Sequence, residues 1–427
     1  MRDIHDAARL ARDAAITLSM ASNDARSRAL LAAAEAIEAQ SGSIFEANRL
    51  DVERSQAEGL AQPLLKRLKF DGKKLATVCD GLRQLANMPD PLGRVLYGCS
   101  MDDGLDLTRV TCPIGVIGII FESRPDALVQ ISGLCLKSGN AVLLKGGSEA
   151  VLTNRVLFEA IYSATVACGM PEGWAALLET RQDVAEMLKL DDCIDLIIPR
   201  GSNQFVRHIM DNTRIPVMGH ADGICHVYVD QSADAAMAVK VALDSKAQYV
   251  AVCNAAETLL VHRDIAPVFL PAMKDAFDKA HVEVRGCERT RRIIDVLPAS
   301  EEDWSTEYLD YIISVKVVDS LDEAIMHVNR YGSHHTDAIV AGDNEAAERF
   351  MGMVDSAGVF HNCSTRFADG YNYGLGAEVG IGTGKLHARG PVGLDGLVSY
   401  KYKLRGHGQA MAEYASGERS FRHSPLP

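Results

Sequence analysis

A cysteine in a loop is the first residue of this chain whose type and position could do chemistry. Cys253 lies in the segment YVAVCNAA, between an expected helix over 235–248 and an expected strand over 257–262. Small alanines beside it leave room for a substrate, and a cysteine thiolate attacks carbonyl carbon well. Cys253 is therefore a candidate nucleophile. A buried structural thiol, which fits Cys79 and Cys135 well, is the alternative interpretation.

Three polar turns form a second group of candidates. They are Glu122-Ser123-Arg124, Lys145-Gly146-Gly147-Ser148 and Arg200-Gly201-Ser202, and each follows an apolar segment typical of a buried strand. The carboxyl ends of parallel strands share one sheet edge, where ligands bind. Glycines let backbone N–H groups approach a phosphate, and an ammonium or a helix N-terminus adds positive potential. Ordinary strand-to-helix turns are the alternative, and no GxGxxG fingerprint follows a strand.

Histidines and arginines elsewhere are weaker signals. The histidines, including the pair His334 and His335, lack the i, i+4 helical spacing of a zinc site, so no metal is expected. Arg366 in STRFADG and Arg389 in KLHARGP lie in glycine-rich segments, where a guanidinium suits a carboxylate or phosphate. A surface ion pair is an equally good interpretation of either arginine.

The elements that must position these residues follow an α/β pattern. The first 90 residues are amphipathic and helical, and residues 90–111 have the turns and alternation of a hairpin. From Pro113 strands alternate with helices, which predicts parallel crossovers and a doubly wound sheet. A second α/β unit begins near Asp230, glycines crowd 370–396, and the polar residues after Gly406 are expected to fray.

Length and composition exclude several classes of protein. The 427 residues carry 44 Lys+Arg and 57 Asp+Glu, a net charge of −13, which argues against a nucleic-acid-coating protein. Apolar stretches are far shorter than the roughly 20 residues of a membrane span, and no signal peptide is apparent, so we expect a cytoplasmic protein. Ten dilute cysteines without a CxxC pair exclude a disulfide scaffold.

Several long sequence motifs indicate a resemblance to a known family. They are PIGVIGIIFESRPD at 113–126, GNAVLLKGGSEA at 139–150, CNAAETLLVH at 253–262, DSLDEAI at 319–325, and STRFADG with LGAE and KLHARGP beyond. Through them the chain resembles the gamma-glutamyl phosphate reductase family, a branch of the aldehyde dehydrogenase superfamily, from about residue 5 to residue 409. The resemblance implies two doubly wound α/β domains plus a small β oligomerisation element.

The implied reaction is a reductive step of proline synthesis. NADPH would reduce L-glutamyl 5-phosphate to glutamate 5-semialdehyde and phosphate, and the product would cyclise to 1-pyrroline-5-carboxylate. The resemblance also implies a homo-oligomer, built through the hairpin at 95–112 and a strand at 398–404, and a possible functional association with glutamate 5-kinase. Neither a nucleic-acid partner nor a membrane is expected.

The resemblance assigns roles by motif position. Cys253 matches the catalytic cysteine, Lys145 the lysine at the adenosine ribose, Gly201 and Ser202 the pyrophosphate turn, and Glu307 the nicotinamide ribose. Two departures from oxidising relatives are Glu122, where these have an oxyanion asparagine, and His220, where they have a water-activating glutamate. An enzyme that reduces its thioester must keep water out, so the loss of that glutamate favours reduction.

The expected mechanism begins with attack by Cys253 on the acyl phosphate. Its own backbone N–H and a neighbouring side chain such as Asn254 would hold the oxyanion, and Arg124 or Lys385 would neutralise phosphate. Arg366, with three neighbours, is the hypothesis for gripping the amino-acid end of the substrate; those neighbours are Asn362, Ser364 and Thr365. His361 departs from the family pattern, where an apolar residue precedes Asn362.

The resemblance also divides the chain. It predicts an NADPH-binding domain over 1–94 and 113–231, a catalytic domain over 232–387, an oligomerisation element over 95–112 and 388–410, and a flexible tail over 411–427. Two other functions stay open. One is an oxidising or acylating aldehyde dehydrogenase on the same scaffold, and the other is a catalytically silent nucleotide-binding protein.

Overall fold

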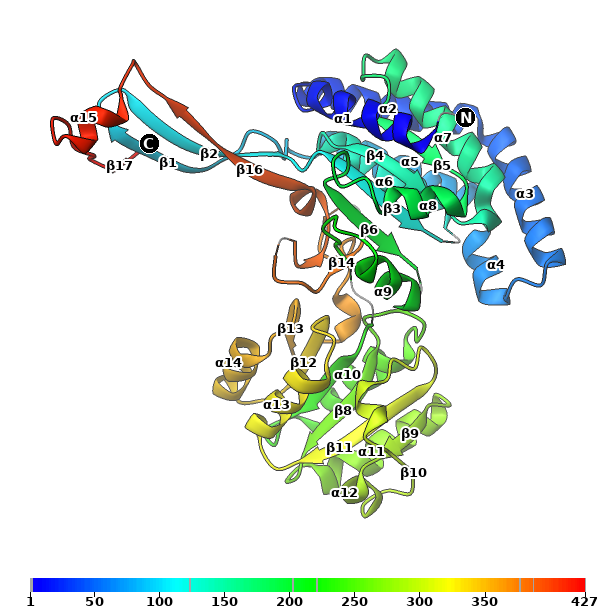
Figure 1. The fold of residues 1–427 in the computed structure, drawn as a ribbon. Helices are drawn as coiled ribbons and strands as arrows, with labels where there is room; N and C mark the ends of the chain where they lie inside the picture. The colour runs from blue at the N-terminus through cyan, green and yellow to red at the C-terminus, as the bar shows by residue number, and fades with distance from the viewer. Residues whose placement is uncertain are drawn as a thin grey trace.

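The computed structural model describes residues 3–122, 124–201, 203–219, 222–375, 378–386 and 388–426, without the side chains of Pro63 and Arg181. Two α/β domains lie one above the other in Figure 1, and a narrow β arm extends from the upper domain. The predicted α/β architecture is confirmed, while the predicted domain boundaries stay a prediction. No helix among the described residues is long and apolar enough to cross a membrane.

The first domain is built on a parallel sheet with the strand order β5-β4-β3-β6. Its strands are β3 (Val116–Phe121), β4 (Ala141–Lys145), β5 (Ala175–Leu178) and β6 (Leu196–Arg200). Apolar residues on one sheet face pack against α2 (Asn23–Ala39), α5 (Gly72–Asn87), α6 (Pro125–Lys137) and α7 (Val151–Ala167). The other face packs against α1 (Ile4–Leu18), α8 (Arg181–Met187) and α9 (Asn203–Asp211). Both faces are covered, which explains the unbroken apolar runs of the strands.

The second domain contains a parallel sheet with the order β10-β9-β11-β8-β7-β12-β13. Its strands are β7 (Cys225–Val229), β8 (Ala256–His262), β9 (Glu283–Gly286), β10 (Leu297–Pro298), β11 (Ile312–Val318), β12 (Thr336–Val340) and β13 (Gly358–His361). Its helices are α10 (Ala235–Ala247) and α11 (Ala266–Lys279) on one face, and α13 (Leu321–Tyr331) and α14 (Asn344–Met353) on the other. Two apolar clusters, one on each face, form its core.

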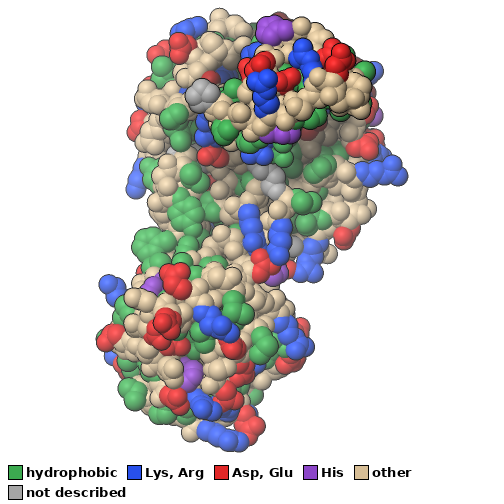
Figure 2. All heavy atoms as spheres, turned by 90° about the vertical axis from the view of Figure 1, so that its left-hand side faces the viewer, with side chains coloured by type: hydrophobic (Ala, Val, Ile, Leu, Met, Phe, Trp, Pro, Cys, Tyr) green, Lys and Arg blue, Asp and Glu red, His purple; other side chains and the backbone are tan. Residues whose placement is uncertain are grey.

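The arm is a four-stranded sheet of order β16-β2-β1-β17, and its strands are β1 (Val95–Asp102), β2 (Leu105–Pro113), β16 (Val398–Arg405) and β17 (Ser424–Pro425). The predicted hairpin is therefore present, as β1 and β2. Beyond it, the expectation of a frayed tail is wrong, because α15 (Met411–Ala415) and β17 cover the edge of β1. Tyr414, Arg419 and Arg422 reach Asp102, whose burial requires such partners. Figure 2 looks toward the arm and shows acidic and basic side chains gathered at its tip.

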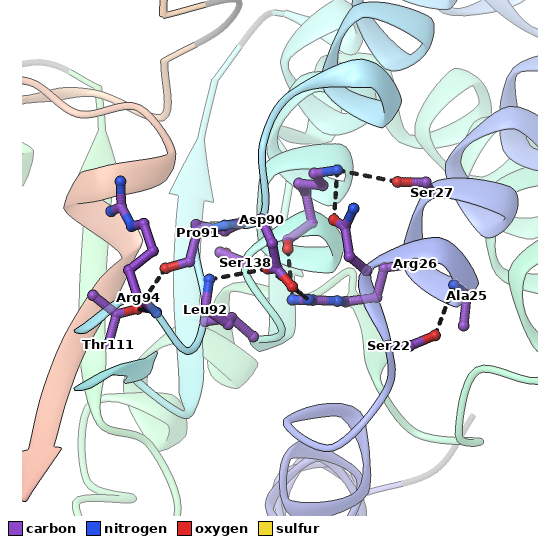
Figure 3. A network of polar contacts seen from close by, with 12 residues as sticks. Ser22, Ala25, Arg26, Ser27, Asp90, Pro91, Leu92, Arg94, Thr111 and Ser138 are labelled. Carbon is purple, nitrogen blue, oxygen red and sulfur yellow. Dashed lines mark hydrogen bonds and ion pairs between the residues drawn. The ribbon is translucent and has the colours of Figure 1, made fainter. Parts of the chain in front are cut away.

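A buried polar network fixes the base of the arm to the first domain (Figure 3). Arg26, 1% exposed, donates to Asp90 at 2.8 Å and to the Lys137 carbonyl at 2.9 Å. Thr111, at the end of β2, donates to the Pro91 carbonyl at 2.7 Å. Buried charges of this kind are stable only when paired, so the network sets the direction in which the arm leaves the domain.

Candidate active site

The carboxyl edge of the first sheet brings the predicted turns together. Ile120 pairs with Lys145, and Phe121 pairs with Arg200, so Glu122, Lys145 and Arg200 all lie at this edge. Ser123 and Ser202 lie outside the described residues. The expected grouping of the three turns is thus observed for the residues that the structure describes.

The turn after β4 is held by a helix far away in sequence. Lys145 is 6% exposed and donates to the Gly146 carbonyl at 2.5 Å. A Cβ atom at Gly146 would lie 2.1 Å from the Asn154 side-chain amide nitrogen, so a larger residue there would displace Asn154. From α3 (Ser41–Ala57), the buried Asp51 accepts a hydrogen bond from the Thr153 N–H at 2.8 Å. Ser148 and Gly147 lie in this turn, directly before α7.

Glu122 lies with the Lys145 turn. Burial and the nearby charge of Glu149 raise the pKa of the Glu122 carboxyl, and the Lys145 ammonium opposes that shift. A Cβ atom at Gly201 would lie 3.2 Å from the Glu122 carboxyl carbon. The predicted oxyanion role of Glu122 gains no support from these neighbours, because all three belong to turns of the first sheet.

The amino edge of the second sheet carries Cys253. Cys253 precedes β8, His335 directly precedes β12, and Gly223 precedes β7, which lies between those two strands. His335 Nε2 lies 3.2 Å from Cys253 Sγ. A Cβ atom at Gly223 would lie 2.4 Å from Cys253 Cα, so a side chain at Gly223 would displace the cysteine. His335 is not among the site residues predicted from the sequence, because the pair His334 and His335 was considered only as a possible metal site.

Buried hydrogen bonds fix the loop of Cys253. Asn254 donates to the Ala368 carbonyl at 2.9 Å, and Thr365 Oγ1 donates to the Asn254 carbonyl at 2.7 Å. Ser364 accepts from Ser245 Oγ at 3.2 Å. Asn254, Ser364 and Thr365 are all buried, and these hydrogen bonds support the loop. The predicted roles of their side chains toward substrate and oxyanion stay a prediction.

Asn362 and Lys385 have protein partners of their own. The Asn362 amide exchanges two hydrogen bonds with the backbone of Ala341, each of 2.9 Å, so both its polar atoms are used. Lys385 is largely exposed and forms an ion pair with Asp355 at 2.6 Å, beside Arg389 at 2.9 Å. The predicted contacts of Asn362 with substrate and of Lys385 with phosphate stay predictions.

Two arginines act electrostatically on Cys253. Burial lowers the pKa of Arg200 and of Arg366, while the negative charge that Cys253 carries as a thiolate raises both. Arg366 Nε donates to the Gln248 side chain at 3.0 Å. Such cations attract anionic groups of a substrate.

Arg200 lines a cavity of about 230 Å³ together with Arg124. The same cavity is lined by Asp369 and Glu378, and one Arg200 nitrogen lies 3.9 Å from a Glu378 oxygen. The sequence placed Arg200 with the cofactor turns. In the structure Arg200 also lines a cavity with residues of α5, α6 and the loop after β13, and its predicted cofactor contact stays a prediction.

Glu307 joins the two domains. Its carboxylate accepts a hydrogen bond of 2.6 Å from Asn203, which also donates to Asp222 at 2.8 Å. Asn203 begins α9, directly after the Arg200 turn. Glu307 therefore lies beside the carboxyl edge of the first sheet, and its predicted contact with the cofactor ribose stays a prediction.

A buried ion pair brackets the cysteine loop. Lys246 near the end of α10 and Glu257 in β8 approach to 2.5 Å, and both side chains are fully buried. Burial raises the pKa of Glu257, and the Lys246 ammonium opposes the shift. In the sequence this pair is visible only as a single lysine seven residues before Cys253 and a single glutamate four residues after it, each within an apolar pattern.

Comparisons with known proteins identify the family. Residues 1–291 match the model of the aldehyde dehydrogenase family. A gamma-glutamyl phosphate reductase of Pelotomaculum thermopropionicum is 61% identical over 99% of this chain and 98% of its own, and one of Ruminiclostridium cellulolyticum is 62% identical over 97% and 96%. The crystal structure of the Thermotoga maritima gamma-glutamyl phosphate reductase has a TM-score of 0.93 at 41% identity, over 96% of this chain and all of that one.

More distant solved structures share the fold alone. An engineered glycolyl-CoA reductase with bound NADP⁺ has a TM-score of 0.65 at 15% identity, and covers 94% of this chain and 96% of its own. The α/β fold of the chain agrees with that of these structures. The chain belongs to the gamma-glutamyl phosphate reductases of the aldehyde dehydrogenase family, which carry out a reduction step of proline biosynthesis.

Proposed function

We propose that the chain reduces L-glutamyl 5-phosphate to L-glutamate 5-semialdehyde and phosphate, with NADPH, through a thioester on Cys253. One observation carries the proposal most strongly. A partly exposed cysteine is fixed at a sheet edge beside His335, near two arginines, and the Asn203–Glu307 contact joins this domain to the glycine and lysine turns of the other. A nucleophile flanked by cations suits an acyl phosphate.

The proposed reaction has two steps, acyl transfer to Cys253 and reduction of the resulting thioester. Cys253 Sγ attacks the acyl carbonyl, the bond from that carbon to the phosphate oxygen breaks, and a thioester forms. The Cys253 backbone N–H donates a hydrogen bond to the oxyanion, and an arginine neutralises the charge of the departing phosphate. Bound NADPH supplies hydride to the thioester carbon. The carbon–sulfur bond then breaks, which releases the aldehyde and returns the Cys253 thiolate.

The carboxyl edge of the first sheet fits a dinucleotide. Lys145 supplies a buried ammonium, and Gly146 and Gly147 leave the backbone N–H groups accessible. Helix α7 begins directly after this turn. These groups would hold phosphate and ribose oxygens. The preference for NADPH over NADH is part of the proposal. It predicts a KM for NADPH at least tenfold below that for NADH in the forward reaction.

The charges of the Arg124–Arg200 cavity indicate how the substrate lies. The cavity presents two guanidinium groups and two carboxylates, Asp369 and Glu378. A zwitterion, with one carboxylate and one ammonium, matches that pattern better than a phosphate dianion does. We therefore assign the amino-acid end of the substrate to this cavity, and Arg366 to the phosphate. This reverses the sequence-based hypothesis, which gave Arg366 the α-carboxylate.

The reverse reaction tests the proposed function. NADPH formation from glutamate 5-semialdehyde and NADP⁺ is followed with and without phosphate, in the wild type and in Cys253→Ala. We expect turnover that depends on phosphate and is lost in Cys253→Ala but kept in Cys168→Ala, an exposed cysteine outside the site. Phosphate-independent oxidation by the wild type would instead indicate a hydrolytic aldehyde dehydrogenase. His220, which bears on that alternative, lies outside the described residues.

The same assay separates the two arginines, because semialdehyde and phosphate have separate KM values in this direction. Arg200→Met should raise the KM for semialdehyde by about tenfold or more, and Arg366→Met should do so for phosphate. If Arg366→Met raises only the semialdehyde KM, the sequence-based assignment is right and ours is wrong.

Assembly is a further part of the proposal. The arm exposes Tyr97, Tyr400, Tyr402 and Leu404, and β16 forms a sheet edge on the arm. Exposed apolar side chains on an open edge favour pairing with another chain. We propose a homo-oligomer in the cytoplasm, which sedimentation analysis of the wild type and of Leu404→Glu would test. Association with glutamate 5-kinase would show as co-sedimentation of the two enzymes.

A further inference from the structure

A histidine and the candidate nucleophile form a close pair at the amino edge of the second sheet. His335 Nε2 lies 3.2 Å from Cys253 Sγ, a normal distance for a hydrogen bond that involves sulfur. The histidine is 1% exposed, and Cys253 is partly exposed. The cysteine can therefore meet a substrate on one side while the imidazole contacts it from within the protein.

Hydrogen bonding orients the imidazole ring. His335 Nδ1 lies 2.9 Å from Thr336 Oγ1. A hydroxyl oxygen can accept a hydrogen bond from Nδ1–H, and in the tautomer with its proton on Nδ1 the Nε2 lone pair faces the thiol. Thr336 is itself buried as the first residue of β12. The ring is thus presented to sulfur by a rigid strand.

The other groups around Cys253 explain why a base such as His335 is needed to take the thiol proton. α10 ends shortly before Cys253, so the carbonyl end of this helix faces the loop. The Cys225 thiol, from β7, contacts the Cys253 carbonyl at 3.2 Å and adds no positive charge. Arg200 from β6 and Arg366 from the loop after β13 interact electrostatically with Cys253, but neither guanidinium accepts a proton.

We propose that His335 takes the thiol proton of Cys253 before attack and returns a proton to the sulfur after the aldehyde leaves. This inference rests on the proposed function, because it assigns a base to the same nucleophile. The protons balance. The S–H bond breaks as an N–H bond forms at Nε2; sulfur then bonds to the acyl carbon as phosphate departs. After hydride transfer the carbon–sulfur bond breaks, and the imidazolium proton restores the thiol.

Alkylation of Cys253 tests this role without any turnover. The rate of iodoacetamide modification at pH 7 is measured by mass spectrometry of the Cys253 peptide in wild type, His335→Gln and His334→Asn. His334 is the matched control, since it is the adjacent histidine but its Nδ1 contacts the Asp355 carbonyl. Its φ of 61° is one that asparagine tolerates.

We expect alkylation to slow by about tenfold or more in His335→Gln and to stay near the wild-type rate in His334→Asn, because only the thiolate reacts. The pH at which the alkylation rate reaches half its maximum should also rise in His335→Gln. Wild-type rates at all pH values in His335→Gln would overturn the proposal, even if turnover were lost, since His335 would then only position substrate.

A second variant tests the same proposal if His335→Gln does not fold. Thr336→Val keeps the shape of the side chain but removes the acceptor for Nδ1–H, so alkylation should slow by a smaller factor, about threefold. An unchanged rate in Thr336→Val, with His335→Gln unfolded, would overturn the proposal. Failure of the proposed function is distinguishable, because it would appear as phosphate-independent turnover with the Cys–His pair still reactive.

Discussion

The two parallel sheets of this molecule place their functional residues at opposite edges. In the first sheet, Glu122, Lys145 and Arg200 lie at the carboxyl ends of neighbouring strands. In the second, Cys253 and His335 lie before the strands that they adjoin, at the amino ends. The rule that ligands bind at carboxyl ends therefore covers only the candidate residues of the first sheet. The candidate residues of the second sheet lie at its other end, which is joined to the first domain through the Asn203–Glu307 contact.

The two edges are also supported differently. The carboxyl edge presents glycine and charged side chains on turns. The amino edge is fixed from within by buried hydrogen bonds and by the Lys246–Glu257 pair. A nucleophile must be placed within fractions of an ångström of its target, which explains the denser support.

Breaking the buried pair should have the largest effect. Glu257→Gln leaves the Lys246 ammonium buried beside a neutral partner, and we expect about 3–5 kcal/mol less free energy of unfolding. Urea denaturation measures it. Asp275→Asn, which breaks an exposed i, i+4 pair with Lys279, is the matched control and should cost about 0.5 kcal/mol or less. Equal losses in both variants would contradict the special role of the buried pair.

Gly223→Ala tests the placement of Cys253. The new Cβ would overlap the Cys253 backbone, so the cysteine must shift, and we expect kcat/KM to fall about 100-fold. Gly352→Ala in α14 is the control, because a Cβ there meets no atom within 4 Å. Steady-state kinetics with confirmed folding distinguishes the two. Full activity in Gly223→Ala would show that the amino edge tolerates displacement.

His327, under the second sheet, should make this domain sensitive to acid. Burial, His226 and Lys316 lower its pKa from 6.5 to about 2, so the unfolded chain binds a proton below pH 6.5 that the folded chain does not. Stability is therefore lost as pH falls. Between pH 6.5 and 5 we expect the wild type to lose about 2 kcal/mol relative to His327→Gln, measured by urea unfolding at both pH values. Parallel curves for the two proteins would contradict the assignment.

Lys145→Met, which changes a turn at the carboxyl edge, should have a smaller effect than the variants described above. We expect the KM for NADPH to rise about tenfold, while kcat changes little, because the ammonium contributes binding energy alone. The alkylation rate of Cys253 serves as the internal control and should not change. A fall in kcat with an unchanged KM would place Lys145 in the chemical step.

Much of this organisation could be predicted from the sequence, and the failures share a physical cause. Apolar runs and glycine turns are local signals, so the sheets, the lysine turn and the loop of Cys253 were predictable. The observed contacts of Asn254, Asn362, Thr365 and Lys385 were not, because each has a partner more than 20 residues away. The Cys253–His335 contact spans 82 positions, and only the parallel pairing of β8, β7 and β12 brings the two residues together.

The pre-steady-state reaction without phosphate tests the central claim most directly, namely that hydride transfer and acyl transfer meet at Cys253. Wild-type enzyme is mixed with glutamate 5-semialdehyde and NADP⁺ in a stopped-flow instrument, and the protein is then examined by mass spectrometry. We predict a rapid burst of about one NADPH per active site, a glutamyl adduct on Cys253, and fast turnover only after phosphate is added. Fast phosphate-dependent turnover with neither a burst nor an adduct would contradict the thioester and the role given to Cys253.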